Sequence, residues 1–145
     1  MKRISLFPLF SLFIIKAKSQ ELLNANRSEI KKAMTKQGGM LMNESADIML
    51  GMFPKPVAEK NDIYNMMFFI AHDKCYKYVV KYGTDRNLST LLAKFDNPNS
   101  GFKRTGKGLK WIDSKGDQIN VLDVYRNGVK ISAFSLEIQT KHIIG

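Results

Sequence analysis

The sequence predicts an α+β domain in which one curved antiparallel sheet has two helices packed on one face. Three observations predict it: two segments with apolar residues at helical spacing, several segments in which apolar and polar residues alternate, and short turns rich in glycine, asparagine and aspartate. Few helices and many short strands joined by hairpins are typical of the α+β class.

The first predicted helix lies in NRSEIKKAMTKQGG, residues 26–39. Asn26 and Glu29 have the spacing of a capping box, with Ser28 as an alternative cap. The helix is expected to end at the two glycines, because glycine accepts the left-handed conformation found just after a helix. The apolar residues of its predicted buried face are Ile30, Ala33 and Met34.

The second predicted helix lies in RNLSTLLAKFDNPN, residues 86–99. Asn87 is a suitable N-cap, and Pro98 blocks extension of the helix. Its predicted buried face consists of Leu88, Leu91, Leu92 and Phe95.

The chain between these helices predicts four strands. Residues 40–52 form two short strands around a turn at 43–45, and residues 53–62, FPKPVAEKND, form a loop because two prolines cannot donate to a strand ladder. Residues 63–71, IYNMMFFIA, are almost wholly apolar, which is typical of a central strand covered on both faces or of a short buried helix. The strand-rich remainder favours the strand.

Residues 75–82 alternate, and with 63–71 they predict a hairpin around His72-Asp73-Lys74. Strict alternation separates two sets of side chains on the second strand. We expect one set to face the helices: Tyr76, Tyr78, Val80 and Tyr82. We expect the other set to face away from them: Cys75, Lys77, Val79 and Lys81.

Four further strands are predicted after the second helix, at about 101–105, 108–113, 118–125 and 129–138. The last two are joined by Asn127-Gly128, the strongest short signal for a tight hairpin, because both residues tolerate positive φ. Both halves then have the order helix, two short strands, hairpin, about 61 residues apart. A tandem helix-plus-strands repeat is therefore an alternative description, although residue identity between the halves is poor.

The N-terminus predicts a secretory signal peptide. Lys2 and Arg3 precede a mostly apolar run over residues 4–15, and Ala17-Lys18-Ser19 places small residues two apart. The run is too short to span a bilayer, which needs about 20 residues, so a membrane anchor is the weaker alternative. We expect residues 1–19 to be removed and residues 20–145 to form one domain in a secreted or periplasmic protein, with no later transmembrane segment.

Charge and cysteine content limit the function classes. The predicted signal removes four of the 23 basic residues and none of the 13 acidic ones, which leaves 19 against 13, a net charge of +6. This modest basic balance favours anionic surfaces without indicating nucleic acid. One cysteine cannot form an internal disulfide, so the fold depends on its core.

His72, Asp73 and Cys75 are candidates for a reactive site, because three chemically active side chains lie within four positions. A cysteine nucleophile needs a histidine within hydrogen-bond reach, and a zinc site needs three or four ligands, which this chain does not supply near Cys75. The segment therefore predicts a polar hairpin turn. We expect Cys75 to be a partly exposed free thiol, because it shares a strand face with Lys77 and Lys81.

Two other groups of residues are candidate binding surfaces. Methionine and phenylalanine side chains adapt to apolar ligands, so one group predicts an apolar pocket, with ordinary core filling as the alternative: Met40, Met42, Met49, Met66 and Phe68. Basic residues beside aromatic ones, together with the proline-stiffened loop, predict a shared surface for a partner: Phe53, Lys55, Lys103, Arg104, Lys107, Lys110 and Trp111.

No nucleophile elbow, phosphate loop or zinc motif occurs in the sequence, so no enzyme, metal or cofactor is expected. We expect a non-catalytic binding module for a protein partner or an anionic envelope component. The alternative is a carrier of a small apolar ligand or lipid that uses the Met/Phe-lined pocket.

Overall fold

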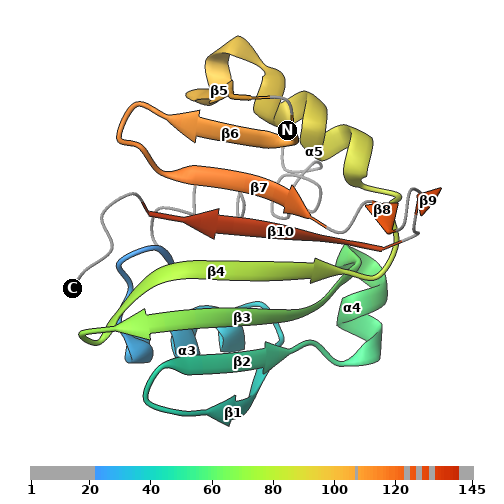
Figure 1. Ribbon diagram of the computed structural model, residues 1–145. Helices are drawn as coiled ribbons and strands as arrows, with labels where there is room; N and C mark the ends of the chain where they lie inside the picture. The colour runs from blue at the N-terminus through green and yellow to red at the C-terminus, as the bar shows by residue number, and fades with distance from the viewer. Residues whose placement is uncertain (1–21, 107, 123–124, 127–128, 131–132, 141–145) are drawn as a thin grey trace, which may run out of the picture.

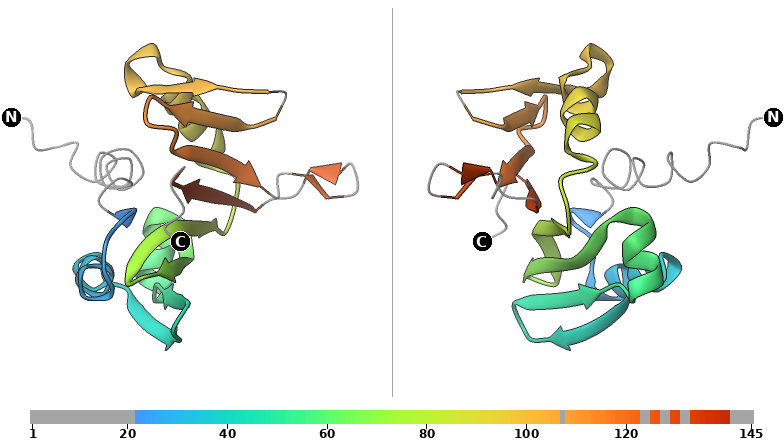
Figure 2. Two further views of the ribbon diagram at one scale, coloured as in Figure 1. Left: turned by 60° about the vertical axis from the view of Figure 1, so that its left-hand side comes forward. Right: turned by 90° about the vertical axis from the view of Figure 1, so that its right-hand side faces the viewer.

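The computed structural model describes residues 22–106, 108–122, 125–126, 129–130 and 133–140. In this part of the chain, eight antiparallel strands form one sheet, and three α-helices lie on one of its faces (Figures 1 and 2). The α+β class and the curved antiparallel sheet are thereby confirmed, with one helix more than expected. The predicted signal peptide lies outside the described residues. None of the described helices is long and apolar enough to cross a membrane.

The first half of the chain supplies four neighbouring strands of the sheet, and the second half supplies the other four. The elements of the first half are α3 (Arg27–Lys36), β1 (Met40–Glu44), β2 (Ile48–Met52), α4 (Lys55–Asn61), β3 (Ile63–Ala71) and β4 (Lys74–Tyr82). The second half contains α5 (Leu88–Asp96), the 3₁₀ turn η2 (Pro98–Ser100), β5 (Phe102–Arg104), β6 (Lys110–Asp113), β7 (Gln118–Leu122), β8 (Tyr125–Arg126), β9 (Val129–Lys130) and β10 (Phe134–Gln139).

The strand order is β1-β2-β3-β4-β10-β7-β6-β5. Each half therefore contributes four consecutive sheet positions, and the halves meet where β4 pairs with β10. The first half carries two of the described helices, α3 and α4, and the second half carries α5. The tandem helix-plus-strands repeat stays a prediction. The edges of the sheet are β1 and β5.

Local signals account for the two predicted helices. Asn26 and Glu29 form the complete capping box of α3, and Ile30 and Met34 are buried against the sheet. Leu88, Leu91 and Phe95 form the buried face of α5. Asn87 occupies the N-cap of α5, but its side chain makes no capping hydrogen bond, contrary to expectation.

The expected loop at 53–62 contains a short helix, α4, so that prediction was wrong. Its two prolines lie at the N-cap (Pro54) and in the first turn (Pro56), where a helix has no partner for the backbone N–H in any case. Ala58 is completely buried and anchors the helix to β3. The helix ends at Asp62, which adopts the left-handed conformation with φ 61°.

The second half contains more strands than the sequence predicted. The expected strands at 118–125 and 129–138 are each divided: β7 pairs with β10 inside the sheet, and β8 pairs with β9 in a separate two-stranded ladder. Tyr125 pairs with Lys130, and Arg126 pairs with Val129. The Asn127-Gly128 turn itself lies outside the described residues.

The β3–β4 hairpin turns at His72 and Asp73, one residue fewer than expected. Both residues have positive φ, 51° and 61°, which is the pattern of a two-residue type I′ turn. Neither residue is the best choice for it, because asparagine and glycine adopt this conformation with less strain.

Replacing His72 by asparagine and Asp73 by glycine is therefore expected to raise the free energy of unfolding by about 0.5–1 kcal/mol. Urea denaturation followed by circular dichroism measures this change. The substitution also removes an ion pair between Asp73 and Arg27 at 3.8 Å, but this pair is largely exposed and contributes little. A clear loss of stability would show that the side chains at the turn matter more than its backbone conformation.

A β-bulge changes the orientation of side chains at the start of β4. Ile70 pairs with Cys75 and Phe69 with Lys77, so Tyr76 is an extra residue without a counterpart on β3. Beyond the bulge, Tyr78, Val80 and Tyr82 are buried as predicted. Tyr76 itself is only half-buried, and its ring lies 6.4 Å from that of Phe69, so the prediction that it faces the helices was wrong.

The bulge also corrects the prediction for Cys75. Because one extra residue separates it from Tyr78, Cys75 points to the same side as Tyr78 and is completely buried. The expectation of a partly exposed thiol was wrong, since it assumed strict alternation along the whole strand.

Candidate functional site

The face of the sheet opposite the helices is the main candidate site, and we call it the helix-free face. On β2, Met49 and Gly51 are buried towards the helices, so alternation directs Ile48, Leu50 and Met52 to the helix-free face. The same rule applies to β3, where Met66, Phe68 and Ile70 are buried and the intervening residues point the other way.

Strand register places apolar side chains of three strands next to one another on this face. Met40 pairs with Met52, Leu50 with Met67, and Ile48 with Phe69. Directly paired residues lie about 5 Å apart, so their side chains are in contact range. We call this group the methionine patch: Met40, Ile48, Leu50, Met52, Met67 and Phe69.

The methionine patch is exposed where it reaches the edge of the sheet. Met40 is 53% exposed, Met52 39% and Ile48 37%, while the other three members are half-buried. Met42, at the irregularity in β1, is 56% exposed. Single exposed apolar residues are ordinary, but neighbouring ones on one face are typical of an interaction surface.

The five residues of the predicted apolar pocket do not all point to the same face of the sheet, because side chains alternate along each strand. Met49, Met66 and Phe68 are buried in the core between sheet and helices, at 0%, 2% and 1% exposure. Met40 and Met42 are exposed to solvent on β1. The five residues therefore do not line one enclosed cavity: three of them fill the core.

Cationic side chains share the helix-free face with the methionine patch. Lys77 and Lys81 of β4 alternate with the buried Tyr78, Val80 and Tyr82. Two more basic residues of this face lie on the far strands: Lys103 and Lys110, whose side chains point away from the side of the buried Trp111. Their alternation with buried neighbours places all four lysines on one face.

Only one of these four lysines has a carboxylate partner among the described residues. Lys77 Nζ lies 3.7 Å from Glu137 and 4.4 Å from the centre of the Phe69 ring. No ion pair joins Lys81, Lys103 or Lys110 to the part of the chain that the structure describes. The face therefore combines an apolar end with a basic end.

The predicted basic and aromatic surface is partly a structural cluster on the other face. Trp111 is completely buried, and its Nε1 donates to Asp96 at 2.8 Å. Arg104 donates to both oxygens of Asp96, at 2.8 and 3.3 Å, and lies 4.9 Å from the centre of the Trp111 ring. These hydrogen bonds lower the pKa of Asp96 and raise that of Arg104, and they join β5 and β6 to the end of α5.

The other members of that predicted surface lie apart from one another. Phe53 is buried at 7% exposure, and Lys55 is exposed on α4 beside β3. The 103–110 hairpin is near the opposite edge of the sheet, beyond β4, β10 and β7. Strands are about 4.8 Å apart, so the two groups are separated by about 20 Å across the sheet. The structure therefore does not bring them together, and a shared partner surface stays a prediction. Lys107 lies outside the described residues.

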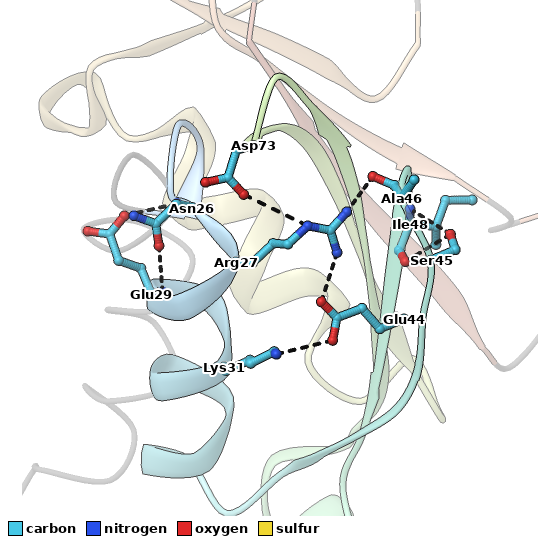
Figure 3. A network of polar contacts seen from close by, with 9 residues as sticks. All are labelled: Asn26, Arg27, Glu29, Lys31, Glu44, Ser45, Ala46, Ile48 and Asp73. Atoms are coloured by element: carbon cyan, nitrogen blue, oxygen red, sulfur yellow. Dashed lines mark hydrogen bonds and ion pairs between the residues drawn. The ribbon is translucent and has the colours of Figure 1, made fainter.

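A network around Arg27 fixes the β1 end of the sheet to α3 (Figure 3). Arg27 donates to Glu44 at 2.9 Å and to the carbonyl oxygen of Ala46, and Lys31 lies 3.2 Å from Glu44. Hydrogen bonds from Arg27 and then from Lys31 lower the pKa of Glu44. This network uses its charges internally and holds the β1–β2 hairpin in place, so it is a support for the methionine patch.

The His72–Cys75 segment is a turn and a core position. His72 is exposed at the turn, whereas Cys75 is buried and its Sγ donates to the carbonyl oxygen of Lys77 at 3.3 Å. Burial raises the pKa of the thiol to about 12. In the described part of the chain no group of three or more histidine, cysteine, aspartate or glutamate residues is placed to hold a metal ion.

Native protein is therefore expected to resist a thiol reagent at pH 8 and to react once denaturant is added, because the buried thiol holds its proton. Rapid reaction of the folded protein would show that β4 opens locally.

Stability should also fall at alkaline pH. The raised pKa of folded Cys75 means that its contribution is complete below pH 9.0 and is lost as the pH rises towards about 12. Cys75→Ala should make the stability curve less steep in this window.

The helix-free face was missed by the sequence patterns, although one signal for it was present. Residues 63–71 are apolar at nearly every position, which is typical of a strand covered on both sides. In the structure, the described helices cover one side of β3 only. No protein-family model matches the chain, and no significant match was found to a curated protein or to a solved structure.

Proposed function

We propose that this chain is a secreted or periplasmic, non-catalytic binding module that contacts a protein partner or an anionic surface of the cell envelope through its helix-free face. One observation carries the proposal. β3 has the composition of a strand buried on both sides, while the described helices cover only the side of Met66, Phe68 and Ile70.

The methionine patch supports a binding role because covering it removes apolar surface from water. Burial of apolar area contributes about 25 cal/mol per Å², and methionine side chains adapt to the shape of a partner. Lys81, next to the patch, forms no ion pair within the described part of the chain and would select for negative charge on that partner.

Secretion is supported by the composition of residues 1–19, with a basic start, an apolar run and small residues at the junction. Mass spectrometry of the protein recovered from its own cells is expected to give a chain that begins at Gln20. A full-length chain in the cytoplasmic fraction would contradict this part of the proposal.

Site-specific photo-crosslinking tests the binding face. A photoreactive residue at Leu50 or Met52 should form crosslinks to a partner in the cells that produce the protein. The matched controls are Lys32 on α3 and Ser89 on α5, which are exposed on the helix side. Equal crosslinking from all four positions, or no crosslink to either protein or lipid from Leu50 and Met52, would overturn the proposed face.

A further inference from the structure

We propose that the partner of the helix-free face is an anionic lipid membrane, which the protein binds peripherally with the methionine patch in the interface and the neighbouring lysines at the head groups. This inference rests on the proposed function, since it names the partner of the same face. Charge complementarity and the layout of the face carry it.

The apolar end of the face lies at the rim of the sheet. Met40 and Met42 belong to the edge strand β1, and Ile48 and Met52 to its neighbour β2, and these four are among the most exposed large apolar residues described. A rim can enter an interface without the whole twisted sheet having to lie flat on it. Unbranched methionine side chains suit disordered acyl chains, which offer no fixed pocket.

The basic residues border the apolar end on its inner side. Lys77 pairs directly with Phe69, so its ammonium group is beside the patch. Lys81 pairs with Asn65, which in turn pairs with Met52, so it is two strands, or about 10 Å, from that methionine. Long lysine side chains can keep their charge at head-group level while their stems pack on apolar surface.

The charges of the face favour an anion over a neutral surface. Among the described strand residues of the helix-free face, Glu137 is the one carboxylate, whereas the basic residues include Lys77, Lys81, Lys103 and Lys110. A polyanionic glycan would use the lysines and leave the methionine patch uncovered. An anionic lipid satisfies both ends of the face, since its acyl chains cover apolar side chains and its head group attracts lysine.

Vesicle flotation with the mature protein tests the inference. The protein is expected to float with vesicles that contain phosphatidylglycerol, to float much less with pure phosphatidylcholine, and to lose binding as salt is raised. The double substitution Met40→Ser and Met52→Ser should weaken binding by about tenfold or more, because two exposed apolar side chains no longer enter the interface.

A charge pair of variants separates this face from overall charge. Lys81→Glu should weaken binding about tenfold at low salt, whereas Lys32→Glu, the same change on the exposed side of α3, should have little effect. All these positions are exposed, and circular dichroism of each variant confirms that the fold is retained. Equal loss with Lys32→Glu would overturn the inference, because binding would then follow net charge alone.

Failure of this inference is distinct from failure of the proposed function. If the mature protein does not float with either vesicle but Leu50 and Met52 crosslink to a protein, the lipid inference is wrong and the binding face stands with an acidic protein as its partner. If neither flotation nor face-specific crosslinking occurs, both proposals are wrong.

Discussion

Replacement of Trp111 by alanine is expected to lower the free energy of unfolding by about 3–5 kcal/mol, the cost of removing a fully buried large aromatic side chain. The ring packs 5.2 Å from that of Phe95 and donates a hydrogen bond to Asp96, so the substitution leaves a cavity between α5 and β6. Since domains of this size are stable by about 5–15 kcal/mol, the substitution is expected to remove a large part of the free energy of unfolding.

Urea denaturation followed by circular dichroism measures the effect, because Trp111 is the only tryptophan and its fluorescence is lost in the variant. Trp111→Phe keeps most of the packing and removes only the N–H donor, and should cost about 1–2 kcal/mol. Lys110→Ala, at the adjacent outward position, should change stability by less than about 0.5 kcal/mol. Similar losses for Trp111→Ala and Lys110→Ala would contradict the burial of the indole.

Tyr78 is expected to respond in opposite directions to two substitutions. Tyr78→Ala should lower the free energy of unfolding by about 3–5 kcal/mol, because the side chain is completely buried and its ring lies 5.9 Å from that of Phe68. Tyr78→Phe should be neutral or raise it by about 1 kcal/mol, because the buried hydroxyl has no hydrogen-bond partner among the described residues.

The same denaturation measurement checks both variants. Burial raises the pKa of Tyr78, so its hydroxyl stays protonated at neutral pH and the comparison concerns an uncharged group. Val79→Ala is the control, because Val79 is the next residue on β4, lies on the opposite face and is only half-buried. Its substitution should lower the free energy of unfolding less than Tyr78→Ala does. A loss of more than about 1 kcal/mol in Tyr78→Phe would show that the hydroxyl is hydrogen-bonded, for example to a buried water molecule.

The helices and hairpins that could be predicted depend on interactions between near neighbours in the chain. The capping box of Asn26 and Glu29 joins residues three positions apart, and the apolar face of α5 repeats every three or four residues. The strands 40–44 and 63–71 follow from composition in the same way. The helix α4 is not predicted by its two prolines, because proline disfavours a helix interior, but here both prolines occupy the start of the helix, where proline is accepted.

On β4, the sequence predicts the orientation of side chains correctly only for the residues that follow the bulge at Tyr76. Tyr78, Val80 and Tyr82 alternate with Lys77 and Lys81, as the sequence indicated. The extra residue at Tyr76 depends on how β4 pairs with β3, which alternation along one strand does not report. That pairing is what makes Cys75 a core residue.

The candidate site could be predicted only in part, for a related reason. Lys103 and Lys110 lie on one sheet face and form no ion pair with the described residues. Trp111 and Arg104 point to the other side and bind Asp96 at the end of α5. Proximity in the sequence suggested one basic and aromatic surface. Strand alternation divides it between two faces.

The helices α3 and α5 and the almost wholly apolar strand at residues 63–71 are encoded locally and can be predicted from the amino-acid pattern. The burial of Met49 and Met66 in the core, and the exposure of Met40 and Met52, depend on the packing of the whole domain. Hydrophobic spacing reports which side chains share a face, whereas the packing of helices onto the sheet sets which face is removed from water.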